Sequence, residues 1–493
     1  MARLTEVSLK SRVTVFFLMA AVIFAGLTAY RTLPRESYPD IEIPLIIVYT
    51  VYPGAAPADV EKQVTDQLER ELKGLEGIKE ITSTSQESAS VITVEYVSGT
   101  DIDMALQKVR DRVDLAKPDL PTDAEEPILQ EISFSDIPII QVNLSGDVGP
   151  VVLKDLAEDL QDELEGIRGV LKVDLVGGLE REVRVDVNPE KLRQYGLALS
   201  DVVDAIGDEN VSIPGGDMDL GPQTFAVRVP GEVSDPLMVG EFVIQARGGQ
   251  PIFVKDVATV SFGFKDRDSF ARIDGRESVA LAVSKRTGAN VIEVADAVKE
   301  QVAIYESQWP GGVEATILGD QSKDIRRMVK DLENNILSGL VLVVLVLMFA
   351  LNFRNALFVG LAIPFSMLLT FLAVQLMGET LNMVVLFALI LAVGMLVDNA
   401  VVVIENIYRH MQEGKSRMEA ASIATKEVGS AIFFSTLTTL AAFSPLFFWP
   451  DIVGDFMWFL PFTVCLALAA SLLVAFTVNP TLAATFMKVK EKD

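Results

Sequence analysis

Four polar residues interrupt a long apolar segment at residues 383–408: Asp398, Asn399, Glu405 and Asn406. The segment is long enough to cross a bilayer as a helix. An aspartate near the middle of such a helix costs roughly 2.5–3.5 kcal/mol on insertion scales, so an ionisable group there marks a proton or ion site by default. We therefore predict that Asp398 carries a proton or an ion. The alternative is a buried polar contact between helices, a role that Asn399 can fill alone.

The spacing of these residues aligns them along one helix. Residues seven apart lie on roughly the same face, so Asp398 and Glu405 share a face, and Asn399 and Asn406 repeat that spacing one residue later. Polar seams in apolar helices face a bundle interior or a hydrated path. Asp398 and Asn399 are the predicted proton relay, and Glu405 and Asn406 a secondary polar seam. An interfacial position beside Arg409 is an equal alternative for Glu405.

Loading and releasing a proton requires a change in the surroundings of the carboxylate. Burial raises the pKa of a carboxyl group and a nearby cation lowers it. The middle of every apolar segment lacks Lys and Arg, so a basic partner of Asp398 must come from another chain or a hydrated region. One charge moved through 100 mV yields about 2.3 kcal/mol, enough for a solute gradient of roughly 50-fold per proton.

The composition indicates a membrane protein. The chain has 493 residues, 50% of them hydrophobic, and a mean hydropathy of +0.36. Windows of about 19 residues predict six spans, at residues 13–30, 335–352, 356–377, 383–408, 430–449 and 457–479. About 300 mostly polar residues separate the first span from the second. We expect one anchor, a large soluble insertion and a bundle of five spans.

Charge and residue counts exclude several classes of protein. A net charge of −26 argues against nucleic-acid binding, which requires a basic surface. Cys465 is the only cysteine, so an intrachain disulfide is impossible, and His410 is the only histidine, which excludes multi-histidine metal sites. We predict a core or interfacial role for each. No nucleophile–base pair stands out, so we predict neither an enzyme nor a cofactor.

Basic residues predict the orientation. The first apolar run follows Arg3, Lys10 and Arg12, and it is longer than the hydrophobic region of a signal peptide and lacks a convincing cleavage site. The loops on the same side carry further basic residues: Arg354, Arg409, Lys415, Arg417, Lys426, Lys488, Lys490 and Lys492. The opposite loops, 378–380 and 450–455, carry none. By the positive-inside rule, both termini are cytoplasmic and the insertion is outside.

The insertion contains an internal repeat. The motif Leu68-x-x-Glu71-Leu72-x-Gly74-Leu75-x-Gly77-Ile78 returns as Leu160-x-x-Glu163-Leu164-x-Gly166-Ile167-x-Gly169-Val170. Two copies are too few for a solenoid, but both copies follow one plan. In the first, the periodicity predicts a strand at 43–52, a helix carrying Val60, Val64, Leu68 and Leu72 on one face, strands at 78–86 and 89–97, and a helix at 101–117. This β-α-β-β-α order indicates a split βαβ, ferredoxin-like unit.

The second copy follows a Pro-rich acidic connector at 118–127 and contains an insertion of its own. We expect a strand at 137–144, a helix carrying Leu153, Leu156, Leu160 and Leu164, a strand at 170–176, a β-rich insertion at 180–265, and then a strand at 278–284, a helix at 290–307 and a strand at 313–318. A helix at 321–335 continues into the second span. In span five, four hydroxyl side chains are expected to donate hydrogen bonds between helices: Ser435, Thr436, Thr438 and Thr439.

This order of segments, together with four motifs, resembles the N-terminal half of resistance-nodulation-division (RND) transporters. The closest likeness is to the acriflavine-resistance type of hydrophobe/amphiphile efflux pump. The motifs are GMLVDNAVVVIENIYRHM, YPGAAPADVEKQVTDQLE, SGTDIDMALQKVRDRVDLAKPDLP and ATKEVGSAIFFSTLTTLAAFSPL. Together they are highly specific, and the resemblance covers essentially the whole chain.

The resemblance implies a polytopic α-helical membrane protein with six spans and an α+β periplasmic insertion. It implies an exporter of small hydrophobic or amphiphilic compounds, driven by protons in the inner membrane of a Gram-negative type cell. Such pumps form trimers with a periplasmic adaptor (a membrane fusion protein) and an outer-membrane channel. The implied domains are 1–30 with the first span, porter subdomain 1 at 31–135, porter subdomain 2 at 136–179 and 266–334, a docking subdomain at 180–265, the remaining spans at 335–487, and a cytoplasmic tail at 488–493.

This sequence departs from the family pattern in two respects. Two adjacent acidic residues of the fourth span carry protons in the family; Asp398 matches the first, and Asn399 replaces the second. Family members are about twice this length, and their second half supplies the basic partner. We expect that half to be a separate polypeptide or to be missing through truncation, or two copies of this half to pair.

Other functions compete with this interpretation. Metal-ion or lipid export on the same scaffold is one alternative, although a soft-metal path favours clustered methionines and those of the insertion are widely spaced: Met104, Met218, Met238 and Met328. A membrane scaffold that only docks an adaptor is the alternative outside transport.

Overall fold

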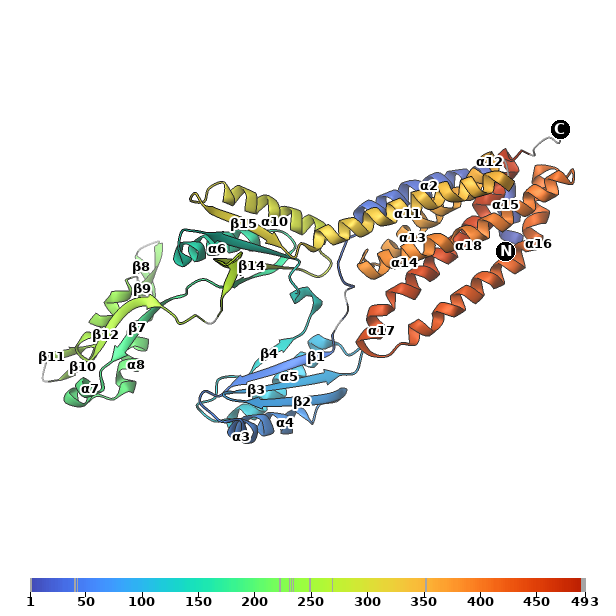
Figure 1. Ribbon diagram of the computed structural model, residues 1–493. Coiled ribbons are helices and arrows are strands. Elements are labelled where there is room, and N and C mark those ends of the chain that lie inside the picture. The colour runs from blue at the N-terminus through green and yellow to red at the C-terminus, as the bar shows by residue number, and fades with distance from the viewer. Residues whose placement is uncertain are drawn as a thin grey trace.

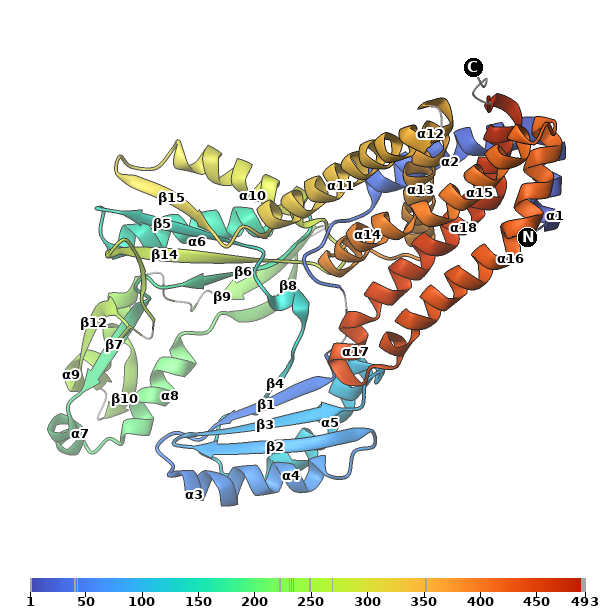
Figure 2. The ribbon, with the colours of Figure 1, turned by 45° about the vertical axis from the view of Figure 1, so that its right-hand side comes forward.

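The computed structural model of the protein describes residues 2–39, 41, 43–220, 223–229, 231, 233, 235–247, 250–267, 269–350 and 353–488. A bundle of long helices occupies one end of the molecule, and three sheet-containing units lie at the other (Figures 1 and 2). Both termini lie at the end of the bundle farthest from the sheets, which we call the distal end (Figure 1).

Six helical segments are long and apolar enough to cross a membrane: Arg12–Thr32, Gln321–Phe349, Asn355–Leu376, Met383–Gln412, Arg417–Phe448 and Asp451–Phe486. The six predicted spans are thereby confirmed as apolar helices. Their elements are α1 (Ala2–Lys10) and α2 (Arg12–Thr32), α11 (Gln321–Ala350), α12 (Phe353–Gly360) and α13 (Ala362–Leu376), α14 (Met383–Met395) and α15 (Val397–Gln412), α16 (Arg417–Phe443) and the 3₁₀ turn η5 (Ser444–Phe448), and α17 (Asp451–Met457) and α18 (Phe459–Phe486).

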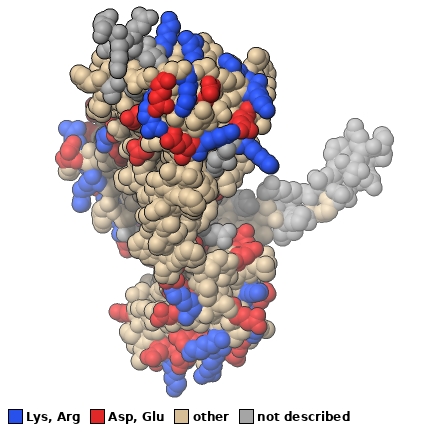
Figure 3. Space-filling model, turned by 90° about the vertical axis from the view of Figure 1, so that its right-hand side faces the viewer, with Lys and Arg blue, Asp and Glu red and all other residues tan. Residues whose placement is uncertain are grey.

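The helices divide into central and peripheral ones. In the span containing α18, 67% of the most apolar stretch is buried, against 6% in α11 and 11% in α16. Helix α18 therefore forms the middle of the bundle, while α11 and α16 expose apolar side chains. Figure 3 shows charged side chains in two zones with an uncharged band between them, as expected for a surface in contact with lipid.

The first soluble unit is an antiparallel sheet of order β2-β3-β1-β4, covered by helices on one face (Figure 2). Its elements are β1 (Leu45–Val51), α3 (Pro57–Val60), the π-helical turn η1 (Glu61–Thr65), α4 (Asp66–Leu72), β2 (Ile78–Gln86), β3 (Ala89–Tyr96), α5 (Ile102–Ala116), η2 (Lys117–Asp119) and β4 (Ile128–Glu131). Alternate residues of β1 and β3 point into one core with α4 and α5. Strand β4 was not predicted, because it is short and pairs with β1 from about 80 residues away in the chain.

The second soluble unit has the order β13-β14-β5-β15, with β6 also pairing with β14. Its elements are η3 (Phe134–Asp136), β5 (Ile140–Gly146), α6 (Pro150–Glu165), β6 (Val170–Val176), β13 (Ala271–Ile273), β14 (Arg276–Lys285), α10 (Val291–Glu306) and β15 (Val313–Leu318). Leucines of α6 fill its core, as their spacing predicts, and valines of α10 pack against them. Helix α11 starts after this unit and runs without a break into the bundle, which confirms the predicted continuity (Figure 1).

The repeated sequence motif encodes the same turn in both units. In each copy a helix ends and a strand starts at the residue after the second glycine: β2 follows Gly77 and β6 follows Gly169. Both glycines have positive φ, +80° and +97°. Residues with a Cβ rarely adopt that conformation, so the turn requires glycine.

The insertion at 180–265 forms a third unit with short sheets. Strands β7 (Arg181–Val187) and β12 (Ala258–Phe264) pair along their whole length, and the remaining elements lie between them in the chain. Those are α7 (Pro189–Tyr195), α8 (Leu199–Glu209), β8 (Ile213–Leu220), β9 (Gln223–Val229), η4 (Pro236–Glu241), β10 (Val243–Arg247), β11 (Gln250–Phe253) and α9 (Val254–Val257). The predicted β-rich character is confirmed, and the helices α7 and α8 were missed.

Candidate functional site

The helical hydrogen-bond pattern of the fourth span is interrupted near its middle, at Leu396, two residues before the predicted site begins, although the backbone there keeps helical dihedral angles. Helix α14 ends at Met395, Leu396 separates the two helices, and Asp398 lies in the first turn of α15. The Leu396 carbonyl accepts a hydrogen bond from Ser471 Oγ of α18 at 2.8 Å. Leu396 is the N-cap residue of α15, and its carbonyl is the first acceptor of that helix. Ser471 adds a second hydrogen bond to this carbonyl and so ties the interruption to α18.

Asn399 connects three helices. Its side chain is 8% exposed; Nδ2 donates to Ser471 Oγ at 3.3 Å, and Oδ1 accepts from Thr436 Oγ1 of α16 at 3.2 Å. An amide supplies both the donor and the acceptor that this position uses, whereas a carboxylate supplies acceptors only. The structure therefore places Asn399 in a polar contact between α15, α16 and α18, and not beside the carboxylate of Asp398.

Asp398 faces outward from the bundle. The residue is exposed, and within the described part of the chain its carboxylate forms no ion pair or hydrogen bond. Glu405, about 10 Å farther along the helix axis, lies on the same exposed face. Apolar residues on this face are exposed as well: Phe387, Leu391 and Val402. We call the outward residues Phe387, Leu391, Asp398, Val402 and Glu405 the open face.

The predicted seam is thus two seams. Asp398 and Glu405 share a face, as their spacing predicts, but that face is exposed. Asn399 and Asn406 share the buried face. One residue along an α-helix corresponds to a rotation of about 100°, which is enough to separate the acids from the amides.

A groove of about 520 Å³ adjoins Glu405 toward the distal end. It is lined by Leu347 of α11, by Glu405 and Arg409 of α15, and by Val428 of α16, among others. Because its walls contain both apolar and charged side chains, the groove can admit water beside Glu405, the residue of the open face nearest the distal end. Among the described residues, no group of three or more His, Cys, Asp or Glu side chains could hold a metal ion.

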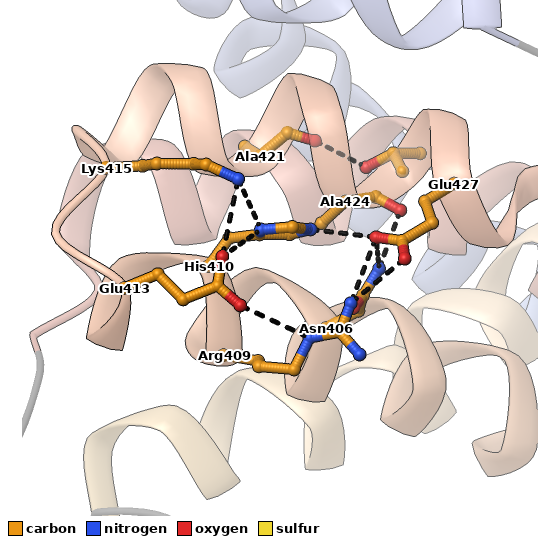
Figure 4. A network of polar contacts seen from close by, with 9 residues as sticks. Asn406, Arg409, His410, Glu413, Lys415, Ala421, Ala424 and Glu427 are labelled. Carbon is orange, nitrogen blue, oxygen red and sulfur yellow. Dashed lines mark hydrogen bonds and ion pairs between the residues drawn. The ribbon is translucent and has the colours of Figure 1, made fainter.

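A polar network closes the distal end of α15 against α16 (Figure 4). Asn406 Nδ2 donates to the Ala424 carbonyl at 3.0 Å and to Glu427 Oε2 at 3.1 Å. His410 Nε2 contacts the same Glu427 oxygen at 2.8 Å, and Arg409 Nη2 donates to Glu427 Oε1 at 3.0 Å. Asn406 is therefore a structural contact between two helices.

The turn after α15 completes this network. His410 Nδ1 lies 2.9 Å from Glu413 Oε2 and 2.8 Å from Lys415 Nζ (Figure 4). Hydrogen bonds from His410 and Lys415 outweigh burial and lower the pKa of Glu413. The predicted core or interfacial role of His410 is confirmed, since the residue is 7% exposed. Glu427 was not predicted, because its place one helix away is visible only in the tertiary structure.

The four hydroxyl residues of span five behave differently from one another. Thr436 donates between helices, as predicted. Thr438 and Thr439 donate instead to carbonyls four residues back in their own helix, so the prediction is wrong for them. Ser435 is exposed. Only the position facing α15 can reach another helix.

We expect Ser471→Ala to destabilise the bundle by about 1–2 kcal/mol, since it removes two bonds and interhelical hydrogen bonds in membranes each contribute roughly 0.6–1.7 kcal/mol. Thermal unfolding in detergent measures the change. Thr477→Ala is the matched control, because Thr477 Oγ1 donates to the Leu473 carbonyl of its own helix, four residues back. Equal melting temperatures for the two variants would contradict the role of Ser471.

One comparison with known proteins bears on the whole chain. The family model described as the AcrB/AcrD/AcrF family matches residues 4–493. The match includes the broken fourth span, the soluble units and both ends of the bundle.

Proposed function

The chain belongs to the AcrB/AcrD/AcrF family of RND transporters, and from this premise we propose that it exports small hydrophobic or amphiphilic compounds in exchange for protons. The observation that carries the proposal is the position of Asp398. A carboxylate lies halfway along an apolar span, at a helix break, at a depth where the described chain supplies no cation. Ionisable groups at that depth mark proton and ion paths.

The proton is held by Asp398, while Asn399 keeps the helix break in place. Asn399, Thr436 and Ser471 fix the start of α15, so the carboxylate is presented at a constant depth. Because the residue after Asp398 is the amide Asn399, the proposed relay has a single carboxylate. Glu405 and the groove beside it form the proposed route between Asp398 and the distal end.

A second helical bundle is proposed to cover the open face. An exposed carboxylate in lipid is unfavourable, and α11 and α16 also expose apolar residues on either side of α15. The covering bundle supplies a Lys or Arg at the depth of Asp398, and exchange of this neighbour loads and releases the proton. The bundle comes from the second half of the transporter or from a second copy of this chain.

A photo-crosslinking residue at Leu391 tests this covering. We expect p-benzoylphenylalanine at Leu391, which is 43% exposed on the open face, to crosslink to protein in native membranes. The same residue at Phe24 of α2, which is 78% exposed, is the control and is expected to react with lipid. Lipid adducts alone at both positions would contradict a covering bundle.

The proposed arrangement in the cell follows from the two ends of the molecule. The distal end carries Arg409, Lys415 and Lys426, and both termini lie there (Figure 1). This supports a cytoplasmic distal end in the inner membrane and soluble units in the periplasm. We further propose that the first two units are ferredoxin-like porter subdomains and that 180–265 docks to the outer-membrane channel, in a trimer bound to a periplasmic adaptor.

Transport in inverted membrane vesicles from cells with the complete transporter tests the function. An imposed difference of one pH unit supplies about 1.4 kcal/mol per proton, so we expect roughly tenfold accumulation of an amphiphilic dye such as ethidium per proton exchanged. A protonophore is expected to abolish it. Dye accumulation that persists without a proton gradient would overturn the proposal.

A further inference from the structure

A buried ion pair joins three segments where the bundle meets the soluble units. Glu36, in the segment after α2, is 2% exposed, and its Oε1 accepts hydrogen bonds from Lys285 Nζ at 2.6 Å and from the Gly288 backbone N at 3.1 Å. Its Oε2 accepts from Thr380 Oγ1 at 3.0 Å. Lys285, the last residue of β14, has a side chain that is only 12% exposed. We call Glu36, Lys285, Gly288 and Thr380 the Glu36 joint.

Backbone hydrogen bonds hold the same segments together. The Glu36 N–H donates to the Leu381 carbonyl at 3.3 Å, and the Leu381 N–H donates to the Pro34 carbonyl at 2.9 Å. On the other side, the N–H of Val291, the first residue of α10, donates to the Arg35 carbonyl at 2.9 Å. The segment after α2 therefore lies between the start of α10 and the turn before α14.

The turn before α14 leads directly to the proton site. Asn382 lies two residues after Thr380, and its Oδ1 caps α14 by accepting from the N–H groups of Val384 and Val385. Asp398 lies 16 residues beyond Asn382, about 24 Å along the helix axis. A displacement of α14 on protonation of Asp398 would reach β14 and α10 through the Glu36 joint.

The first soluble unit is attached to the bundle differently. Its ion pair with α17, Lys79 with Asp451, joins side chains that are 42% and 56% exposed. Exposed pairs of this kind contribute little and are screened by salt. Only the second unit, in the described part of the chain, is tied to the turn before α14 by a buried charge.

Stability alone does not explain a buried pair at this position. Replacing a buried ion pair by apolar residues is often neutral or stabilising, whereas removing one partner is strongly destabilising. A small pocket of about 30 Å³ lies beside Glu36 and Lys285, with room for one or two water molecules. A hydrogen-bonded ion pair fixes both the distance and the direction between its two partners, so the Glu36–Lys285 pair can pass a displacement from one segment to the other.

We propose that Glu36 is a positioning residue that transmits the protonation state of Asp398 from α14 to the second soluble unit. The inference rests on the proposed function and extends it by naming the contact through which the bundle moves the soluble part. Glu36 acts through Lys285, Gly288 and Thr380, and it does not itself carry the transported proton.

The test uses the full chain in lipid nanodiscs and a double variant, Glu36→Gln with Lys285→Met, which removes both charges. Asp398→Asn imitates the protonated site, and hydrogen–deuterium exchange is followed in peptides covering 285–295 and 383–398. We expect Asp398→Asn to change exchange in both peptides of the parent chain. In the double variant, we expect the change to remain at 383–398 and to be lost at 285–295.

Transport by the same variants separates positioning from folding. The double variant is expected to unfold near the parent's melting temperature and yet export dye roughly 2- to 30-fold more slowly, the range of measured coupling effects. Single variants are expected to melt lower. Glu69→Gln with Lys73→Met removes a pair at the end of α4, far from the joint, whose lysine side chain is 65% exposed; it is the control, with parental exchange and transport expected.

Either of two results would overturn the inference: an unchanged response of 285–295 in the double variant, or no response there in the parent. The results that contradict the role of Glu36 differ from those that contradict the proposed function. If Asp398→Asn leaves dye export by the parent intact, the proton site itself is wrong. If that variant stops export while 285–295 responds equally with and without the joint, only the role of Glu36 is wrong.

Discussion

Replacing Asp398 with Asn is expected to abolish export against a gradient. The variant keeps the size of the side chain and the exposed position in the first turn of α15, and removes only the titratable group. A single proton moving through 100 mV supports a solute gradient of roughly 50-fold, and without a carrier for the proton that gradient falls to unity. Dye accumulation in energised inverted vesicles measures the loss.

Glu405→Gln is the matched control for this variant. Glu405 lies on the same open face, but it borders a groove that leads to the distal end. Water and Arg409 can replace part of its function there, so we expect a weaker effect than at Asp398. Equal expression and equal melting temperatures establish that both variants fold. Full dye accumulation by Asp398→Asn would remove the central residue of the proposed mechanism.

Gly26→Leu is expected to prevent correct packing of the bundle, at a cost of about 3 kcal/mol or more. A Cβ on Gly26 of α2 would lie 2.6 Å from Leu368 Cβ and 2.8 Å from the Leu368 carbonyl oxygen of α13. Small residues allow membrane helices to approach closely, and a backbone atom at the contact cannot rotate away as a side chain does. Overpacking usually costs about 1–3 kcal/mol, and a clash with backbone lies at or above that range.

Thermal unfolding and the yield of folded protein in detergent measure this effect. Gly207→Leu in α8 is the control, since a Cβ there meets nothing within 4 Å. We expect Gly207→Leu to melt close to the parent chain. A parental melting temperature for Gly26→Leu would mean that α2 and α13 separate without loss, contrary to the close crossing in the structure.

Much of the fold was predictable because its elements are specified locally. The spans follow from continuous apolar stretches, and β6 and β15 begin and end at the predicted residues, 170–176 and 313–318. The repeated motif ends in glycines whose positive φ requires that residue type. Strand β4 and helices α7 and α8 were missed, because a short edge strand and helices inside a β-rich insertion depend on contacts distant in sequence.

The candidate site shows the same division between local pattern and distant contacts. The sequence alone determined that an acid lies at the middle of the fourth span and that Glu405 shares its face, since both follow from the length and period of a helix. Only the tertiary structure decided that this face is open, that Asn399 binds Ser471 and Thr436, and that Asn406 and His410 meet Glu427. Helical period fixes which residues share a face, whereas the neighbours of each face depend on how segments far apart in the chain pack together.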